Sequence, residues 1–326
     1  PSHSPVVDNI ALTIYYLDSR SISIYRANHR GVRMPPLPTI DFTTTAEGVA
    51  FYRAYDRVLE KWPVDVTCVD LTSQYGTTRV NVCGPLDAPP VVLLPGAGAT
   101  STVWFENVAA LADRFRVYAV DLLGDAGRSI ADGKRIRSID DLMSWLNAVT
   151  EDAGLTDFGL IGHSYGAMIA LAYALREPGR VRNLVLLDPN SCFAGMRASY
   201  LAHAVPLLLR PNEKRERDFI RWETGGQDID EDWLDLLARG AAYFPKSKTI
   251  VPKRPKRNAL EELAVDTTVI LAADSKVHDA GQLAADIAGA LPRLHPIAVE
   301  GATHHTMPMS PAAELNDALI NALSVR

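Results

Sequence analysis

The chain has 326 residues, a formal net charge of −6, 47% hydrophobic residues and 22% charged residues. This composition is ordinary for a soluble globular protein with a large core, and the acidic balance gives no electrostatic reason to bind nucleic acid or an anionic membrane. No apolar run approaches the length that spans a bilayer, and no signal peptide is visible, although a chain that begins with Pro1 leaves room for a removed leader. Three cysteines without metal-ligand spacing favour reduced thiols in a cytoplasmic protein without a bound metal.

Residues 1–45 stand apart from the rest of the chain. They contain two short β-like runs, at 10–17 and 21–25, and a proline-rich piece at 35–38. We expect them to form an N-terminal extension, which either packs on the core as an arm or takes part in a subunit contact. The second alternative would make the protein a homodimer.

The pattern from residue 46 onward predicts an α/β protein. Apolar residues recur on one side of 46–62, which predicts a helix, and the two strands that flank 73–76 predict a hairpin. From Val91 onward, apolar runs alternate with helical stretches, which predicts a mostly parallel, doubly wound sheet with helices on both faces. Residues 46–189 and 266–326 would form this core.

A glycine turn follows the third core strand. Four apolar residues lead into Pro95-Gly96-Ala97-Gly98. Small residues let backbone N–H groups approach an oxygen closely, so this turn suits a developing oxyanion. A glycine-rich turn can also hold phosphate, but neither G-x-G-x-x-G nor a P-loop lysine is present. Phosphate is therefore the weaker alternative, and no cofactor is expected.

Residues 157–166 are the most informative stretch of the chain. An apolar run ends in Gly162-His-Ser-Tyr-Gly166, and a helical pattern follows at once. This is the strand–turn–helix order of a nucleophile elbow, in which the glycines leave room for a strained turn that exposes the serine hydroxyl. The sequence therefore predicts Ser164 as the nucleophile, and the N–H groups of Tyr165 and Ala97 as donors to the oxyanion.

A serine hydroxyl needs a base that removes its proton, and His304 has the expected place in the chain. It follows the apolar run 294–299 and precedes a helical pattern over 311–323. The chain order, serine before histidine, also agrees with the elbow class. His305 is the neighbouring residue, and the sequence alone does not exclude it.

Five segments resemble landmarks of the α/β-hydrolase family, in the order that the family has them. The resemblance extends over roughly residues 50–326 and rests on segments 93–98, 120–129, 162–166, 185–189 and 301–304. It implies an α/β-hydrolase fold and a Ser-His-acid triad. Dehalogenases and epoxide hydrolases of this family use an aspartate nucleophile, so Ser164 argues against both.

The resemblance leaves two candidates for the acid of the triad. Members usually carry an Asp or Glu a few residues past the seventh strand, which here covers 268–273. Ser275 occupies the usual position, Asp274 comes one residue early, and Asp279 looks like the N-cap of the next helix. Asp188, at the end of the sixth strand, is the second candidate, because some members draw the acid from there. We favour Asp274 from its position.

The alternation of strands and helices breaks between residues 190 and 265. Helical stretches at 195–209, 213–223 and 232–243 replace a single crossover helix. An insertion at this point would lie over the carboxyl ends of the strands as a cap that covers the nucleophile and shapes a pocket. The basic stretch 246–257 would link the cap back to the core, or would bind an anionic substrate.

These features indicate a serine hydrolase that cleaves a carboxylic ester or a related acyl bond of a small molecule. The triad would act through an acyl-enzyme, and the expected substrate contacts are Gly96, Trp104, His163 and Phe193. Acyl transfer, lactone opening, C–C bond hydrolysis and cyclisation also keep a serine and stay open. A ligand receptor on this fold, with little or no turnover, is the alternative outside enzymes.

Overall fold

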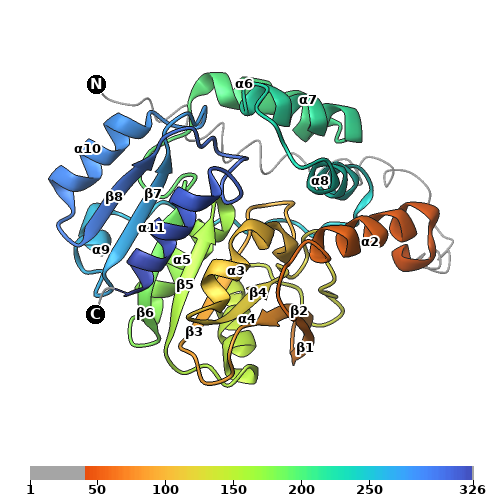
Figure 1. Cartoon of the computed structure of the whole chain (residues 1–326), viewed down its shortest axis with the longest axis horizontal. Coiled ribbons are helices and arrows are strands. Elements are labelled where there is room, and N and C mark those ends of the chain that lie inside the picture. Colours follow the sequence, from red (N-terminus) through yellow and green to blue (C-terminus); the bar gives the residue numbers. More distant parts are fainter. Residues whose placement is uncertain (1–40, 325–326) are drawn as a thin grey trace, which may run out of the picture.

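The structure, a computed structural model, describes residues 41–324. The two β-like runs and the proline-rich piece expected within residues 1–40 lie outside the described residues. The remaining chain forms a twisted sheet with helices packed on both faces (Figure 1).

One sheet of eight strands forms the centre of the fold, in the order β1-β2-β4-β3-β5-β6-β7-β8. β1 and β2 form the expected antiparallel hairpin, β2 also pairs antiparallel with β4, and every other pairing is parallel. This arrangement confirms the predicted mostly parallel α/β sheet. The strands are β1 Thr67–Ser73, β2 Gly76–Cys83, β3 Pro90–Leu94, β4 Arg116–Val120, β5 Phe158–His163, β6 Val181–Leu187, β7 Thr267–Ala272 and β8 Leu294–Val299.

Helices cover both faces of the sheet, with α3 and α11 in front of it and α4 and α5 behind it in Figure 1. Side-chain caps fix several of the helix starts, as where Thr45 accepts from the N–H of Gly48 at the start of α2. The helices are α2 Ala46–Leu59, α3 Val108–Ala112, α4 Ile139–Asp152, α5 Tyr165–Arg176, α6 Ala198–Leu209, α7 Glu213–Glu223, α8 Glu231–Tyr243, α9 Arg257–Glu261, α10 Ala280–Ala290 and α11 Ala312–Ser324; two short 3₁₀ helices are η1 Phe42–Thr44 and η2 Ser101–Glu106.

The central strands are buried on both faces. Every residue of β5 is buried, and its successive side chains enter different hydrophobic clusters: Leu160 joins the cluster with α4 and α5, and Ile161 joins the cluster with α3 and α11. This explains why the core strands have continuous apolar sequences, since a parallel strand covered on both sides has no polar face.

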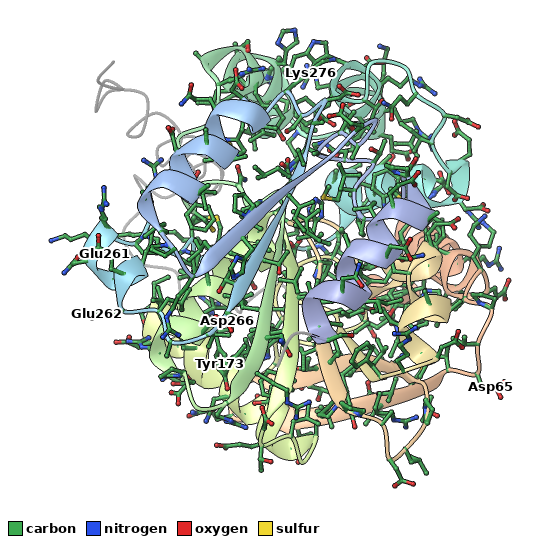
Figure 2. All side chains as sticks on the ribbon, turned by 60° about the vertical axis from the view of Figure 1, so that its left-hand side comes forward. Asp65, Tyr173, Glu261, Glu262, Asp266 and Lys276 are labelled. Carbon is green, nitrogen blue, oxygen red and sulfur yellow. The ribbon has the colours of Figure 1, made fainter. Side chains whose placement is uncertain are left out.

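The helices α6, α7 and α8 lie between β6 and β7 in the chain, and we call them the α6–α8 insertion. They lie at one end of the sheet (Figure 1), and Lys276, which follows β7, lies at that same end (Figure 2). The carboxyl ends of the parallel strands therefore point toward the insertion. All three predicted helices are confirmed, and α8 also packs against α2.

Within residues 41–324, no helix has the length and apolar character needed to cross a membrane. The same part of the chain contains no group of three or more His, Cys, Asp or Glu side chains placed to hold a metal ion.

Candidate active site

Ser164 lies in a strained turn between β5 and α5. Its backbone has φ 52° and ψ −112°, in a region that residues with a side chain rarely adopt. The turn requires its two glycines: a Cβ on Gly162 would lie 2.3 Å from the carbonyl oxygen of Gly166, and a Cβ on Gly166 would lie 2.3 Å from that of Leu94. The predicted nucleophile elbow therefore has the expected geometry.

The structure brings Ser164, His304 and Asp188 together. The Ser164 hydroxyl lies 2.9 Å from Nε2 of His304, and Nδ1 of His304 lies 2.6 Å from Oδ2 of Asp188. Ser164 follows β5, Asp188 follows the adjacent strand β6, and His304 lies in the loop after β8, which is separated from β6 by β7, so the three residues meet at the same edge of the sheet. The side chains form a continuous hydrogen-bonded chain from carboxylate to hydroxyl, which is the geometry of a catalytic triad.

The sequence-based preference for Asp274 as the partner of His304 is wrong. Asp274 is exposed, and its backbone N–H donates to the carbonyl of Ala302. Asp188 is fully buried. It follows the last residue of β6 and has φ 36°, a value that residues other than glycine rarely adopt. Ser275 stands at the usual family position of the acid, and its hydroxyl donates to Oδ2 of Asp188 at 2.9 Å.

In the buried pair His304–Asp188, each residue stabilises the charged form of the other. Burial lowers the pKa of His304, but the hydrogen bond and charge of Asp188, together with the charge of Glu223, raise it above its usual range overall. Burial raises the pKa of Asp188, but its hydrogen bond with His304 holds that pKa below the usual range. Because the carboxylate accepts a hydrogen bond from Nδ1–H, neutral His304 carries its proton on Nδ1, and its Nε2 is free to accept a proton from Ser164.

His163, the residue before Ser164, is buried and neutral. Burial, with the nearby His304, lowers the pKa of His163 to about 3. Its Nε2 lies 2.9 Å from the backbone carbonyl of His304, so Nε2 carries the proton and donates. His163 thereby connects the elbow to the loop that holds His304.

The glycine turn after β3 lies beside the elbow. A Cβ on Gly96 would lie 3.3 Å from Cβ of Ser164 and 3.2 Å from Nδ1 of His163. The N–H of Gly98 donates to Oδ2 of Asp125 at 2.7 Å, so this N–H already has an acceptor within the protein. Ala97, between the two glycines, is exposed, whereas Ser164 and His304 are only 8% and 3% exposed.

Two of the predicted substrate contacts occupy different surroundings. Trp104 is fully buried in the cluster that also holds Tyr200 and Leu237 of the α6–α8 insertion. Phe193 packs instead against the cluster on the α4 and α5 side. Met196 and Trp233 belong to the first cluster, and the partly buried Trp222 and Phe244 pack against it.

Glu223 is a site residue that sequence reasoning missed. It is the last residue of α7, and its carboxylate accepts from the backbone N–H groups of His304 and His305 and lies 3.1 Å from Nδ1 of His305. One signal was available: Glu223 shares a face of α7 with the apolar residues Phe219 and Ile220, and an acid on an apolar face needs a buried partner. The same contacts occupy His305, so the structure brings His304 and not His305 to Ser164.

Comparison with known proteins places the chain in a family. The profile of the alpha/beta hydrolase family matches residues 91–318, and the chain belongs to that family. Its resemblance to this family, inferred from five segments of sequence, is thereby confirmed.

Two of the chain's relatives are named as carboxylesterases of Bacillus subtilis. The chain is 31% identical to carboxylesterase YbfK over 66% of its own length and 71% of that protein, and 32% identical to the uncharacterized carboxylesterase nap over 56% of its length and 59% of that protein. Among solved structures, it resembles naproxen esterase (carboxylesterase NP) of the same organism with a TM-score of 0.78 and 24% identity, over 85% of this chain and 98% of that one. The likeness to this solved structure supports the fold.

Proposed function

We propose that the protein is a carboxylesterase that works through an acyl-enzyme on Ser164. The observation that carries the proposal is the buried chain of hydrogen bonds, 2.9 Å from Ser164 Oγ to His304 Nε2 and 2.6 Å from His304 Nδ1 to Asp188. The names of the relatives support ester hydrolysis as the reaction. An ester-like small molecule is the proposed substrate.

In the first half of the reaction, the Ser164 hydroxyl attacks the ester carbonyl while His304 accepts its proton at Nε2. The buried Asp188 carboxylate stabilises the imidazolium that forms, and His304 then returns the proton to the departing alcohol. In the second half, His304 activates a water molecule that attacks the acyl-enzyme and releases the acid. The raised pKa of His304, which Asp188 and Glu223 cause, favours these steps, because a stronger base takes the serine proton more readily.

The oxyanion of each tetrahedral intermediate needs two N–H donors beside Ser164. We assign them to Tyr165 and Ala97. Tyr165 is the first residue of α5, so its N–H belongs to the positive end of that helix. Ala97 follows Gly96, whose close approach to Ser164 brings the glycine turn to the elbow.

The α6–α8 insertion acts as a cap in this proposal. Tyr200 of α6 contacts the ring of His304 edge-on, with 6.2 Å between ring centroids. Since Ser164 is almost fully buried, a substrate reaches it only when the insertion moves relative to the sheet. A homodimer and a cytoplasmic location remain predictions of the sequence.

The test is hydrolysis of a chromogenic short-chain ester, such as p-nitrophenyl butyrate, by the full chain. Ser164→Ala should lose several powers of ten in turnover while its circular dichroism and melting temperature stay those of a folded protein. The matched control is Ser191→Ala, a serine outside the triad, which should retain its rate. A folded wild-type chain that binds esters without turnover would support the receptor alternative, and equal rates for wild type and Ser164→Ala would reject the esterase.

A further inference from the structure

Glu223 lies at the junction of three parts of the molecule. It belongs to α7 of the insertion, yet it accepts from His304 and His305 in the loop after β8 and from the N–H of Lys276 in the loop after β7. Oε1 lies 3.2 Å from the N–H nitrogen of His304 and 3.4 Å from that of Lys276, and Oε2 lies 3.1 Å from that of His305. The insertion is thus hydrogen-bonded directly to the backbone of the catalytic histidine.

The Glu223 side chain is charged although it is 0% exposed. Burial raises the pKa of its carboxyl, but the hydrogen bond and charge of His305, with the charge of His304 and the backbone donors, hold that pKa at about 2. Burial lowers the pKa of His305 below its usual range, so this ring is mostly neutral near pH 7 and acts on Glu223 as a positive charge only in acid. The negative charge of Glu223 is therefore not cancelled by its nearest neighbour.

His304 experiences that charge. The charge of Glu223 raises the pKa of His304, in addition to the larger effects of burial, which lowers it, and of Asp188, which raises it. The other titratable groups around His304 come from several neighbouring elements: they are Asp188 after β6, His163 at the end of β5, His278 after β7, Tyr200 of α6, and His305 beside it. Lys276 directs its ammonium to the backbone carbonyl and the ring of Trp222.

We propose that Glu223 is a positioning residue that couples the docked insertion to the basicity of His304. The proposal rests on the esterase function. Its backbone bonds fix the loop that presents His304 Nε2 to Ser164, and its charge strengthens His304 as a base. When the insertion lifts to admit a substrate, both effects are lost, and when it closes, both return. The base therefore reaches full strength only over a closed site, from which bulk water is excluded.

The first test is Glu223→Gln in the full chain. Glutamine keeps the shape, and its carbonyl oxygen can still accept from the N–H groups of His304 and Lys276. Its NH2 group would replace Oε2 and face the N–H donors of His305, so those hydrogen bonds would be lost. We expect kcat for a small ester to fall by about one to two powers of ten with KM changed much less. The acidic limb of kcat/KM should move to lower pH, by roughly half a unit or more, because His304 loses a neighbouring negative charge.

The matched control is Asp218→Asn. It removes the same charge from the same helix, but Asp218 is on the exposed side of α7, where it pairs with Lys214. Its rate and acidic limb should equal those of the wild type. A folded Glu223→Gln variant with wild-type kcat and an unmoved acidic limb would overturn the proposal, as would an equal shift in the control.

Glu223→Asp keeps the charge on a shorter side chain and serves if the glutamine variant does not fold. It should lower kcat, since the backbone bonds lengthen, while its acidic limb stays nearer to that of the wild type. A second readout does not depend on turnover: NMR titration of the His304 ring in the Ser164→Ala background should give a lower pKa when Glu223→Gln is added. An unchanged His304 pKa would refute the coupling, whereas a wild type without esterase activity would refute the proposed function instead.

Discussion

Replacing Asp188 by Asn is the most informative single change, because it alters charge without altering shape. The native carboxylate accepts three hydrogen bonds: Oδ2 accepts from His304 Nδ1 at 2.6 Å and from the Ser275 hydroxyl at 2.9 Å, and Oδ1 accepts from the Ala272 N–H at 3.2 Å. An amide group cannot satisfy all three, since it offers one acceptor atom in place of two.

Either orientation of the new amide is costly. If the amide nitrogen faces His304, then Nδ1 must accept, and the proton moves to Nε2, where it blocks proton transfer from Ser164. If the oxygen faces His304, the amide nitrogen meets the N–H of Ala272, and two donors oppose each other in a buried site. By analogy with other triads, turnover should fall by about four powers of ten, or about 5.5 kcal/mol in transition-state stabilisation.

The assay compares initial rates of p-nitrophenyl butyrate hydrolysis for wild type, Asp188→Asn and Asp274→Asn at equal amounts of folded protein. Asp274 is exposed, so Asp274→Asn should stay within a few-fold of wild type. Circular dichroism and thermal unfolding establish that each variant is folded. If Asp274→Asn were the slower enzyme, or if Asp188→Asn kept its rate, the assignment of the acid would be refuted.

Three further outcomes follow from the same contacts. His304→Ala should lose nearly as much esterase activity as Ser164→Ala, with the double variant little worse, whereas His305→Ala should keep most of its rate; the reverse pattern would contradict the assignment of the base. Gly166→Ala should destabilise the fold by about 1–3 kcal/mol or more in urea unfolding, because the new Cβ would lie 2.3 Å from the carbonyl of Leu94; a wild-type midpoint would contradict this. The pKa of Glu223 is held at about 2, against an ordinary value of 4.5, so its ionised form stabilises the fold above that ordinary value. This contribution should be lost as the pH falls from about 4.5 toward 2, and Glu223→Gln should flatten the acid side of a plot of unfolding free energy against pH.

The sequence was sufficient to predict the fold and two members of the proposed triad. Ser164 is fixed by a local requirement, since the strained turn needs small residues at Gly162 and Gly166, and local requirements leave a motif. His304 is fixed by order along the chain, because the last strand brings the following loop to the same edge of the sheet. Both residues could therefore be predicted from the sequence alone.

The acidic partner of His304 could not be predicted in this way. β6 and β7 are neighbours in the sheet, so the residues that follow them, Asp188 and Asp274, both lie near the loop of His304. Which carboxylate reaches the ring depends on one backbone conformation, the positive φ of Asp188, and on the Ser275 hydroxyl that occupies the usual place. Neither has a sequence pattern.

The contacts of Glu223 are harder still to predict from the sequence. It is 81 residues from His304 in the chain, and its role arises only when the α6–α8 insertion packs against the loops after β7 and β8. The acid on an apolar helix face indicates that a buried partner exists, but the identity of that partner is set by tertiary packing.

The most direct test of the central claim is covalent labelling of the full chain with a fluorophosphonate, followed by mapping of the modified peptide by mass spectrometry. We expect one label per chain, on Ser164, with labelling abolished in Ser164→Ala and strongly slowed in His304→Ala. A folded wild-type chain that takes up no label, or that carries it on another residue, would contradict Ser164 as the nucleophile.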